Sequence, residues 1–181
     1  HGDKWYVVTN ENAPNFKIME VGVEDFSRSG WKEVLPHRVD ISIDVPHPAP
    51  YVEVFRDHMV VLERQDCVSR VRVIDLKDMS SHIIDLPEKL HTVVPVDNPN
   101  FNSHILRFSY SSFLTPPTIY EYDMKSRKLE MRKREEAPGF DPSNYATERI
   151  HARAEDGVAI PISLVYRKGA KRDGKNPSYL Y

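Results

Sequence analysis

The sequence is poor in the residues from which compact catalytic motifs are built. Its single cysteine, Cys67, excludes an internal disulfide and a Cys-x-x-Cys metal or redox site. Its seven glycines are nowhere four residues apart, which excludes the Gly-x-Ser-x-Gly nucleophile elbow of an α/β-hydrolase. A phosphate-binding P-loop and a dinucleotide fingerprint are also absent. We therefore expect no catalytic residue and no cofactor-binding residue in this segment, and no cofactor.

The chain also lacks an excess of charge and long apolar runs. Its formal net charge is −2, which gives no electrostatic argument for binding to nucleic acid or to an anionic membrane. No stretch approaches the roughly 18–20 apolar residues of a membrane-spanning helix. A single cysteine favours a reducing, cytoplasmic setting. The expected partners therefore include neither nucleic acid nor a membrane.

Eight histidines raise the question of a metal site. His37, His47 and His58 are spread over one stretch, but no two histidines have the i, i+4 spacing of a helical site and none precedes a glutamate. We expect surface or packing histidines and no metal ligand. Cys67 lies in an expected hairpin loop where no neighbour in the sequence would lower a thiol pKa, so we expect an incidental thiol.

One cluster of basic residues lies near position 130, where three glutamates interrupt it. The pattern predicts a solvated strand face rather than an anion site. Residues 125–136 are also the only candidate helix, but Leu129 and Met131 are two positions apart, which favours a strand. The basic residues are Lys125, Arg127, Lys128, Arg132, Lys133 and Arg134.

The main feature of the chain is a succession of short runs with strand character. Trp5 and Met59 are 54 residues apart, and Met59 and Leu106 are 47 apart, with similar runs following each. A repeat of roughly 40–50 residues with about four strands is typical of a β-propeller blade. A β-sandwich or barrel also produces short strands and remains an alternative. The runs are residues 5–9, 16–23, 59–63, 70–76, 82–86, 105–110, 118–123 and 128–134.

Blades that stack on both faces predict a particular burial pattern. Within residues 70–76 and 105–110 the alternation of apolar and polar residues has period two. We expect Ile74 to be partly covered although it lies on the face opposite its neighbours. The residues expected to be buried are Val71, Val73, Leu106 and Phe108.

A Pro/Gly-rich stretch, residues 135–143, marks a boundary. Pro138 and Pro142 restrict the backbone and favour extended conformations at Ala137 and Asp141. Two apolar-rich runs then flank Asp156-Gly157, which predicts a tight hairpin with positive φ at both central residues. The run 160–166 is largely apolar, which predicts burial on both faces, as in an α/β sheet.

The ends of the chain predict a piece of a longer protein. The first residue is His1 rather than Met. Near the other end, Asp173-Gly174 leads into residues 176–181, which we expect to be a strand that stops before it is completed.

Several distinctive stretches are distributed over most of the chain. The most specific are Gly139-Phe-Asp-Pro-Ser-Asn-Tyr145, Asp156-Gly157 with Pro161-Ile-Ser-Leu-Val-Tyr-Arg-Lys168, and Asp173-Gly-Lys-Asn-Pro177. Supporting stretches include Pro36-His37-Arg38, Phe55-Arg-Asp-His-Met-Val60, Leu106-Arg-Phe-Ser-Tyr-Ser-Ser112 and Tyr120-Glu-Tyr-Asp-Met124. With these residues the sequence resembles the prolyl oligopeptidase family of serine peptidases, and within it oligopeptidase B.

The resemblance implies a mainly β chain that is part of a two-domain enzyme. Residues 1–136 would be the last blades of a seven-bladed β-propeller, and residues 137–144 the crossing between domains. Residues 145–181 would be the first strands of an α/β-hydrolase domain. The oxyanion-hole tyrosine and the Ser, Asp and His of the catalytic triad would follow Tyr181.

The resemblance also implies an activity for the intact protein. It would be a serine endopeptidase that cleaves short peptides, after Arg or Lys if the oligopeptidase B assignment holds, while the propeller excludes folded proteins. Its partners would be peptide substrates and the remaining blades and catalytic domain of the parent chain. The alternative is a non-catalytic propeller that binds ligands. Such a module should end in a turn after a closed blade, whereas the peptidase segment should end within a strand.

Overall fold

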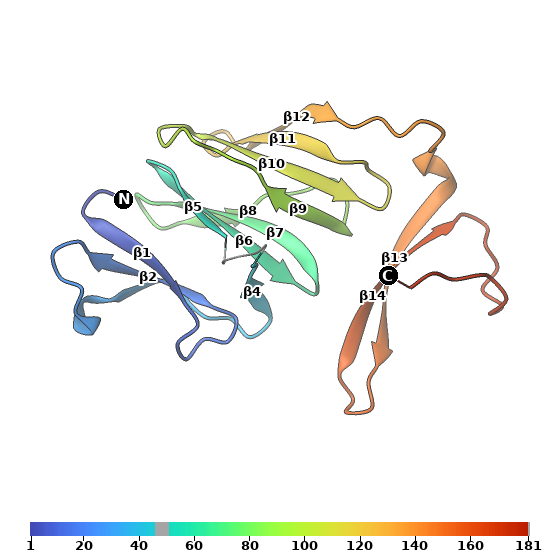
Figure 1. Cartoon of the computed structure of the whole chain (residues 1–181), viewed down its shortest axis with the longest axis horizontal. Coiled ribbons are helices and arrows are strands. Elements are labelled where there is room, and N and C mark those ends of the chain that lie inside the picture. Colours follow the sequence, from blue (N-terminus) through green and yellow to red (C-terminus); the bar gives the residue numbers. More distant parts are fainter. Residues whose placement is uncertain (46–50, 181) are drawn as a thin grey trace.

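The structure is a computed structural model that describes residues 1–45 and 51–180. Two residues discussed above, His47 and Tyr181, lie outside the described residues. Within these ranges the chain forms β-strands and two short 3-10 helices, η1 (Arg28–Gly30) and η2 (Pro142–Asn144), and no α-helix. Three antiparallel sheets follow one another along the chain, and a separate hairpin comes after them (Figure 1).

The first two sheets take up residues 4–83. The first contains β1 (Lys4–Thr9), β2 (Lys17–Gly22) and β3 (Lys32–Leu35) in that order. The second sheet contains five strands, and its two short strands β4 and β5 pair with opposite ends of the long strand β6. The sheet is therefore only four strands across. Its strands are β4 (Ile41–Ile43), β5 (Val52–Val54), β6 (His58–Gln65), β7 (Val68–Asp75) and β8 (Ser81–Ile83).

The third sheet and the hairpin complete the described chain. The third sheet is a four-stranded meander of β9 (His91–Pro95), β10 (Ile105–Ser112), β11 (Thr118–Asp123) and β12 (Lys128–Arg134). The hairpin pairs β13 (Tyr145–Arg153) with β14 (Ala159–Arg167) along their whole length. Strand β12 confirms that residues 125–136 do not form a helix.

The middle sheet is covered on both faces, as stacked blades require. On β6, Met59 and Val61 belong to a core shared with Ile18 of the first sheet. The alternate residues Val60 and Leu62 belong to a second core, shared with the third sheet. A two-layer sandwich leaves one face of each sheet outside the core, so this arrangement favours the propeller over the sandwich.

The predicted burial pattern is confirmed. Val71, Val73, Leu106 and Phe108 are all 2% exposed or less and lie in the core between the second and third sheets. Ile74 lies in the other core, between the first and second sheets, and is also only 2% exposed. It is therefore covered more completely than we expected.

A charged side chain is buried within the blades. Glu63 on β6 is fully buried and accepts hydrogen bonds from Arg72 Nε at 2.6 Å and Arg72 Nη2 at 3.3 Å. Arg38, from the loop between β3 and β4, also pairs with this carboxylate. The Pro36-His37-Arg38 stretch therefore contributes a cation to a buried ion-pair network.

The two hairpin turns differ from the sequence prediction. Asp156 does not have a positive φ; Gly157 alone does, and the Ala154 amide donates to the Val158 carbonyl around a three-residue loop. Positive φ at both central residues occurs instead between β6 and β7, at Asp66 (φ 49°) and Cys67 (φ 58°). The prediction of a two-residue turn at 156–157 was wrong. The loop has three residues, 155–157, and in a three-residue hairpin loop only the last residue, here Gly157, has a positive φ.

Two predictions about the C-terminal part were also wrong. The run 160–166 is not buried on both faces in this chain, because its hairpin pairs with no other sheet and Ile160 and Val165 are 48% and 45% exposed. Residues 176–180 do not form a strand, and Tyr179 and Leu180 are almost fully exposed. A strand needs a neighbour to pair its backbone, and no described strand lies beside this segment.

Candidate functional site

The link between the blades and the hairpin has an ordered, non-repetitive conformation. Asp141 is extended (φ −111°, ψ 104°), as predicted, and its side chain accepts a 2.9 Å hydrogen bond from the Ser143 amide at the start of η2. Asn144 donates to the same carboxylate at 3.0 Å. Gly139 has φ +81°, a conformation that favours glycine, and the rings of Phe140 and Tyr145 lie 5.4 Å apart. The residues of the 139–145 motif therefore shape this link.

The hairpin touches the blades at the turn between β6 and β7. His151 Nε2 lies 3.4 Å from Asp66 Oδ1 across this contact. A small cleft of about 260 Å³, here called the hairpin cleft, opens beside it. Its lining joins Cys67 and Phe113 of the blade turns to Arg149 and Ser163 of the hairpin. Arg149 Nε is buried there without a hydrogen-bond partner among the described residues.

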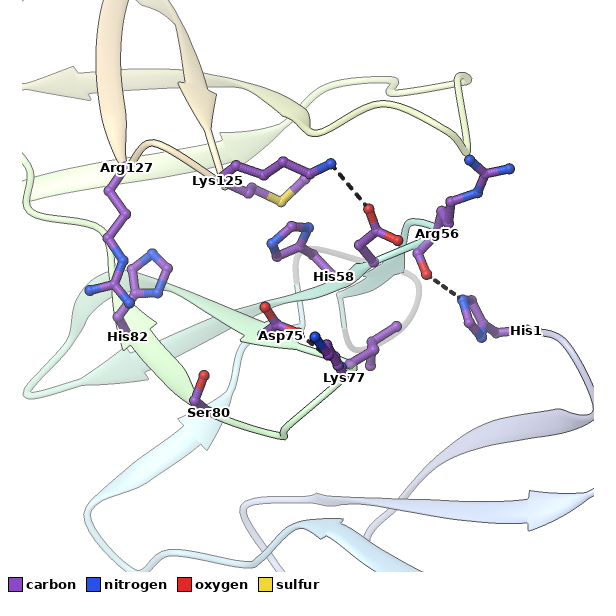
Figure 2. A pocket seen from close by; sticks show the side chains of 12 residues that line it. His1, Arg56, His58, Asp75, Lys77, Ser80, His82, Lys125 and Arg127 are labelled. Atoms are coloured by element: carbon purple, nitrogen blue, oxygen red, sulfur yellow. Dashed lines mark hydrogen bonds and ion pairs between the residues drawn. The ribbon is translucent and has the colours of Figure 1, made fainter.

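A second, larger cavity of about 640 Å³, here called the basic pocket, lies between the second and third sheets (Figure 2). Its walls come from the start of β6, the end of β7, β8 and the turn between β11 and β12. The His1 side chain also contributes to its lining. The residues with charged or titratable side chains from these walls are Arg56, Asp57, His58, Asp75, Lys77, His82, Lys125 and Arg127.

Two histidines of the basic pocket are held by their surroundings. His58 is only 5% exposed, and burial lowers its pKa, although Asp75 and Asp57 act in the opposite direction. His82 Nε2 lies 2.8 Å from the Tyr122 hydroxyl, and burial, followed by the charge of Arg127, lowers the pKa of His82. In both imidazoles burial therefore disfavours the charged form.

The histidines are distributed as packing and surface groups. His58 and His91 pack inside the blades, and His91 Nε2 lies 2.8 Å from the Ser69 carbonyl oxygen. Within the described ranges, no group of three or more His, Cys, Asp or Glu side chains is arranged to hold a metal ion. His37 and His58, which the sequence places in one stretch, do not meet in such a group.

The basic cluster divides into two parts. On β12, Arg132 pairs with Glu121 at 3.1 Å and Lys128 pairs with Glu130 at 2.7 Å, which fits a solvated strand face. Lys125 and Arg127 belong to the preceding turn and line the basic pocket. This second position of Lys125 and Arg127 was not predicted from the sequence. The turn between two predicted strands was the available signal, because turn residues project from the end of a sheet.

Cys67 is exposed at a hairpin turn, as expected, and lines the hairpin cleft. Among the described residues, no helix has the length and apolar character to cross a membrane.

The sequence matches a family profile over most of its length. Residues 1–135 match "Prolyl oligopeptidase, N-terminal beta-propeller domain". A curated relative, dipeptidyl aminopeptidase BI of Pseudoxanthomonas mexicana, is 38% identical over 99% of this chain and 24% of its own length. Prolyl endopeptidase of Elizabethkingia meningoseptica is 27% identical over 99% of this chain and 24% of its own length. The chain thus spans about a quarter of these relatives.

Solved structures show the same similarity in three dimensions. Oligopeptidase B from Trypanosoma brucei, in a closed form with covalently bound antipain, superposes with a TM-score of 0.83. It is 28% identical, and the match covers 97% of this chain and 25% of that chain. The similarity therefore extends past residue 135 and includes the hairpin.

Proposed function

This chain belongs to the prolyl oligopeptidase family, and on that basis we propose that it is part of a serine endopeptidase that hydrolyses short peptides. The observation that carries the proposal is the match of residues 1–135 to the family's propeller. The structural similarity to oligopeptidase B continues beyond that match and into the hairpin.

The proposed division of the chain follows the sheets. Residues 1–136 are propeller blades, residues 137–144 cross between domains, and residues 145–181 begin the α/β-hydrolase domain. Support comes from the hairpin, which shares no sheet with the blades and follows the end of the family match. Its exposed apolar residues, including Ile150, Val158, Ile160 and Val165, would be covered by further strands and helices of that domain.

The proposed chemistry takes place on the parent chain beyond this segment. A serine attacks the peptide carbonyl, a histidine takes its proton and returns it to the leaving amine, and an aspartate orients the histidine. The blades contribute by exclusion, because a propeller over the active site admits short or unfolded peptides and keeps folded proteins out. The proposed partners are thus peptide substrates and the rest of the parent chain, in a cytoplasmic setting.

Cleavage after Arg or Lys is the proposed specificity. Its support is the similarity to oligopeptidase B, while other relatives carry the names dipeptidyl aminopeptidase and prolyl endopeptidase. A site that selects Arg or Lys needs buried carboxylates to pair with the substrate cation. Such a site rejects an uncharged residue strongly, because those carboxylates would then lie unpaired.

Specificity is tested with the full-length protein and blocked fluorogenic peptides that differ only in the residue before the scissile bond. We expect kcat/KM to be at least about 100-fold higher after Arg or Lys than after Pro or Ala. A preference for Pro, or for unblocked dipeptides, would contradict the specificity but leave the peptidase assignment intact. The absence of hydrolysis of every peptide would contradict the assignment itself.

A further inference from the structure

The hairpin lies at one end of the blades, here called the hairpin-side end. Figure 1 shows β13 and β14 beside the ends of the second and third sheets at which β6 and β10 finish. In the second sheet this end carries the turn with Asp66, which contacts His151 of the hairpin. In the third sheet it carries the turn between β10 and β11, where Phe113 lines the hairpin cleft together with Arg149. Both turns are therefore next to the hairpin.

One carboxylate braces the turn between β10 and β11. The Ser112 hydroxyl donates to Glu88 Oε2 at 2.7 Å, and the Thr115 hydroxyl donates to the other oxygen of the same carboxylate. Ser112 Oγ also accepts hydrogen bonds from the Leu114 amide at 3.0 Å and the Thr115 amide at 2.8 Å. Glu88 belongs to the segment between β8 and β9. A second segment of the chain thus fixes this turn through charge-assisted hydrogen bonds.

The braced turn presents an aromatic side chain at the surface. Phe113 is 46% exposed, although it lines the hairpin cleft. One exposed apolar residue is common on protein surfaces, but this one is held in place beside the hairpin. An aromatic side chain on a fixed turn loses little freedom when a partner covers it, which suits it to anchor a protein contact.

The loop between β3 and β4 presents a second apolar side chain at the same end. Val39 is 87% exposed. Its backbone is nevertheless fixed, because Asn15 Nδ2 donates to the carbonyl oxygens of Arg38 at 2.9 Å and Val39 at 3.0 Å. The following residue, Asp40, accepts a 3.0 Å hydrogen bond from Gln65, the last residue of β6 before the turn that touches the hairpin. The loop therefore extends the surface formed by the two turns.

We propose that the hairpin-side end docks the part of the parent chain that follows the hairpin, with Phe113 and Val39 as apolar contacts and Glu88 as the residue that positions Phe113. This inference rests on the proposed function, in which that part is the remainder of the peptidase domain. Continuity supports this occupant, because the hairpin assigned to that domain already contacts this end of the blades. The relatives have the necessary length, since this chain spans only about a quarter of them.

Cysteine labelling of the full-length protein tests this surface. Phe101 is the matched control for Phe113, because it is also 46% exposed but lies at the opposite end of the third sheet, in the loop between β9 and β10. Phe113→Cys and Phe101→Cys are each made in a Cys67→Ser background, and mass spectrometry follows alkylation at each position by a bulky maleimide. We expect position 113 to react at least about tenfold more slowly than position 101. Equal rates would overturn the proposal. Protection that disappears on dilution would also overturn it, because the occupant would then be a second copy of the protein.

Glu88→Gln tests the positioning role. An amide has one acceptor oxygen where the carboxylate has two, so one of the two hydroxyl donors loses its partner. We expect faster amide hydrogen exchange over residues 112–115 and faster alkylation at position 113. Glu33→Gln, at an exposed position on β3, should change neither. Unchanged exchange and alkylation in Glu88→Gln would contradict the role of Glu88. Peptide hydrolysis is a separate readout: its absence would contradict the proposed function, whereas equal labelling rates in an active enzyme would contradict only the docking surface.

Discussion

Glu63 is the centre of an ion-pair network in the second sheet. Its carboxylate is fully buried between Arg72 of its own sheet and Arg38 of the loop that enters that sheet. A buried ion pair gains little over apolar packing, but loss of one partner leaves the other charges uncompensated. Here two guanidinium groups would lose their shared partner. The network therefore fixes the position of the 36–38 loop against β6.

Replacement of the Glu63 carboxylate should destabilise the protein. Glu63→Gln should lower the free energy of unfolding by about 3 kcal/mol, because two largely buried guanidinium groups lose the carboxylate that they share. Glu121→Gln is the matched control, since Glu121 also pairs with two arginines but those arginines are more than half exposed. The control should cost about 1 kcal/mol or less. Urea denaturation of the full-length protein measures both, and equal costs would contradict a structural role for the buried network.

Cys67 occupies a backbone conformation that suits glycine. In the turn between β6 and β7, both Asp66 and Cys67 have positive φ, which is the two-residue turn that hairpins favour. A side chain other than glycine is strained in this region. Cys67→Gly should therefore raise the free energy of unfolding by about 0.5–1 kcal/mol.

Cys67→Ser serves as the control, because it removes the thiol and keeps the strain. It should change stability by less than about 0.5 kcal/mol. Thermal unfolding of the full-length protein compares the two variants. If Cys67→Gly proves less stable than the parent, the strain at this turn is not what the backbone angles indicate.

At the scale of elements, the strands with strong alternation were predictable and the short ones were not. Strands β6, β7, β10 and β11 were predicted because their apolar residues belong to buried cores: those of β6 and β7 face two cores, and those of β10 and β11 alternate toward one. Strands β3, β4, β5 and β9 were missed. They contain three to five residues, and pairing with a longer neighbour rather than their own pattern sets their conformation.

The types of turn could also be predicted only in part from the sequence. Asp156-Gly157 has the sequence of a two-residue turn, yet the strand register adds a residue to that loop. Asp66-Cys67 lacks the glycine, yet its register demands a two-residue turn. The basic pocket could not be predicted for the same reason, because it combines turns of two sheets that are far apart in the sequence.

The link at 137–144 is the element on which domain movement would depend. Pro138 and Pro142 stiffen it, and Asp141 caps η2. Replacement of both prolines with glycine in the full-length enzyme should leave both domains folded. We expect kcat/KM to change more for long peptides than for dipeptide-sized ones, because long substrates would need a wider separation of the two proposed domains. The same change for both lengths would show that the prolines stiffen the link without affecting substrate access.

At the scale of the whole molecule, the propeller and the family were predictable from the sequence. The repeat of short strands favoured the propeller and left a sandwich or barrel as the alternative, while the resemblance of stretches such as 139–145 and 161–168 indicated the family. The burial of the hairpin was predicted wrongly, because a strand has two covered faces only when its whole sheet is present. The chain spans about a quarter of its relatives, so the peptidase activity is a property proposed for the parent chain.

We propose that these blades and this hairpin belong to a serine peptidase whose nucleophile lies outside residues 1–181. The most direct measurement compares this segment with the full-length protein, using an arginyl fluorogenic peptide and a serine-directed phosphonate. We expect hydrolysis and covalent labelling for the full-length protein, and neither for the segment. Hydrolysis by the segment that the phosphonate abolishes, or a full-length protein that the phosphonate does not label, would contradict it.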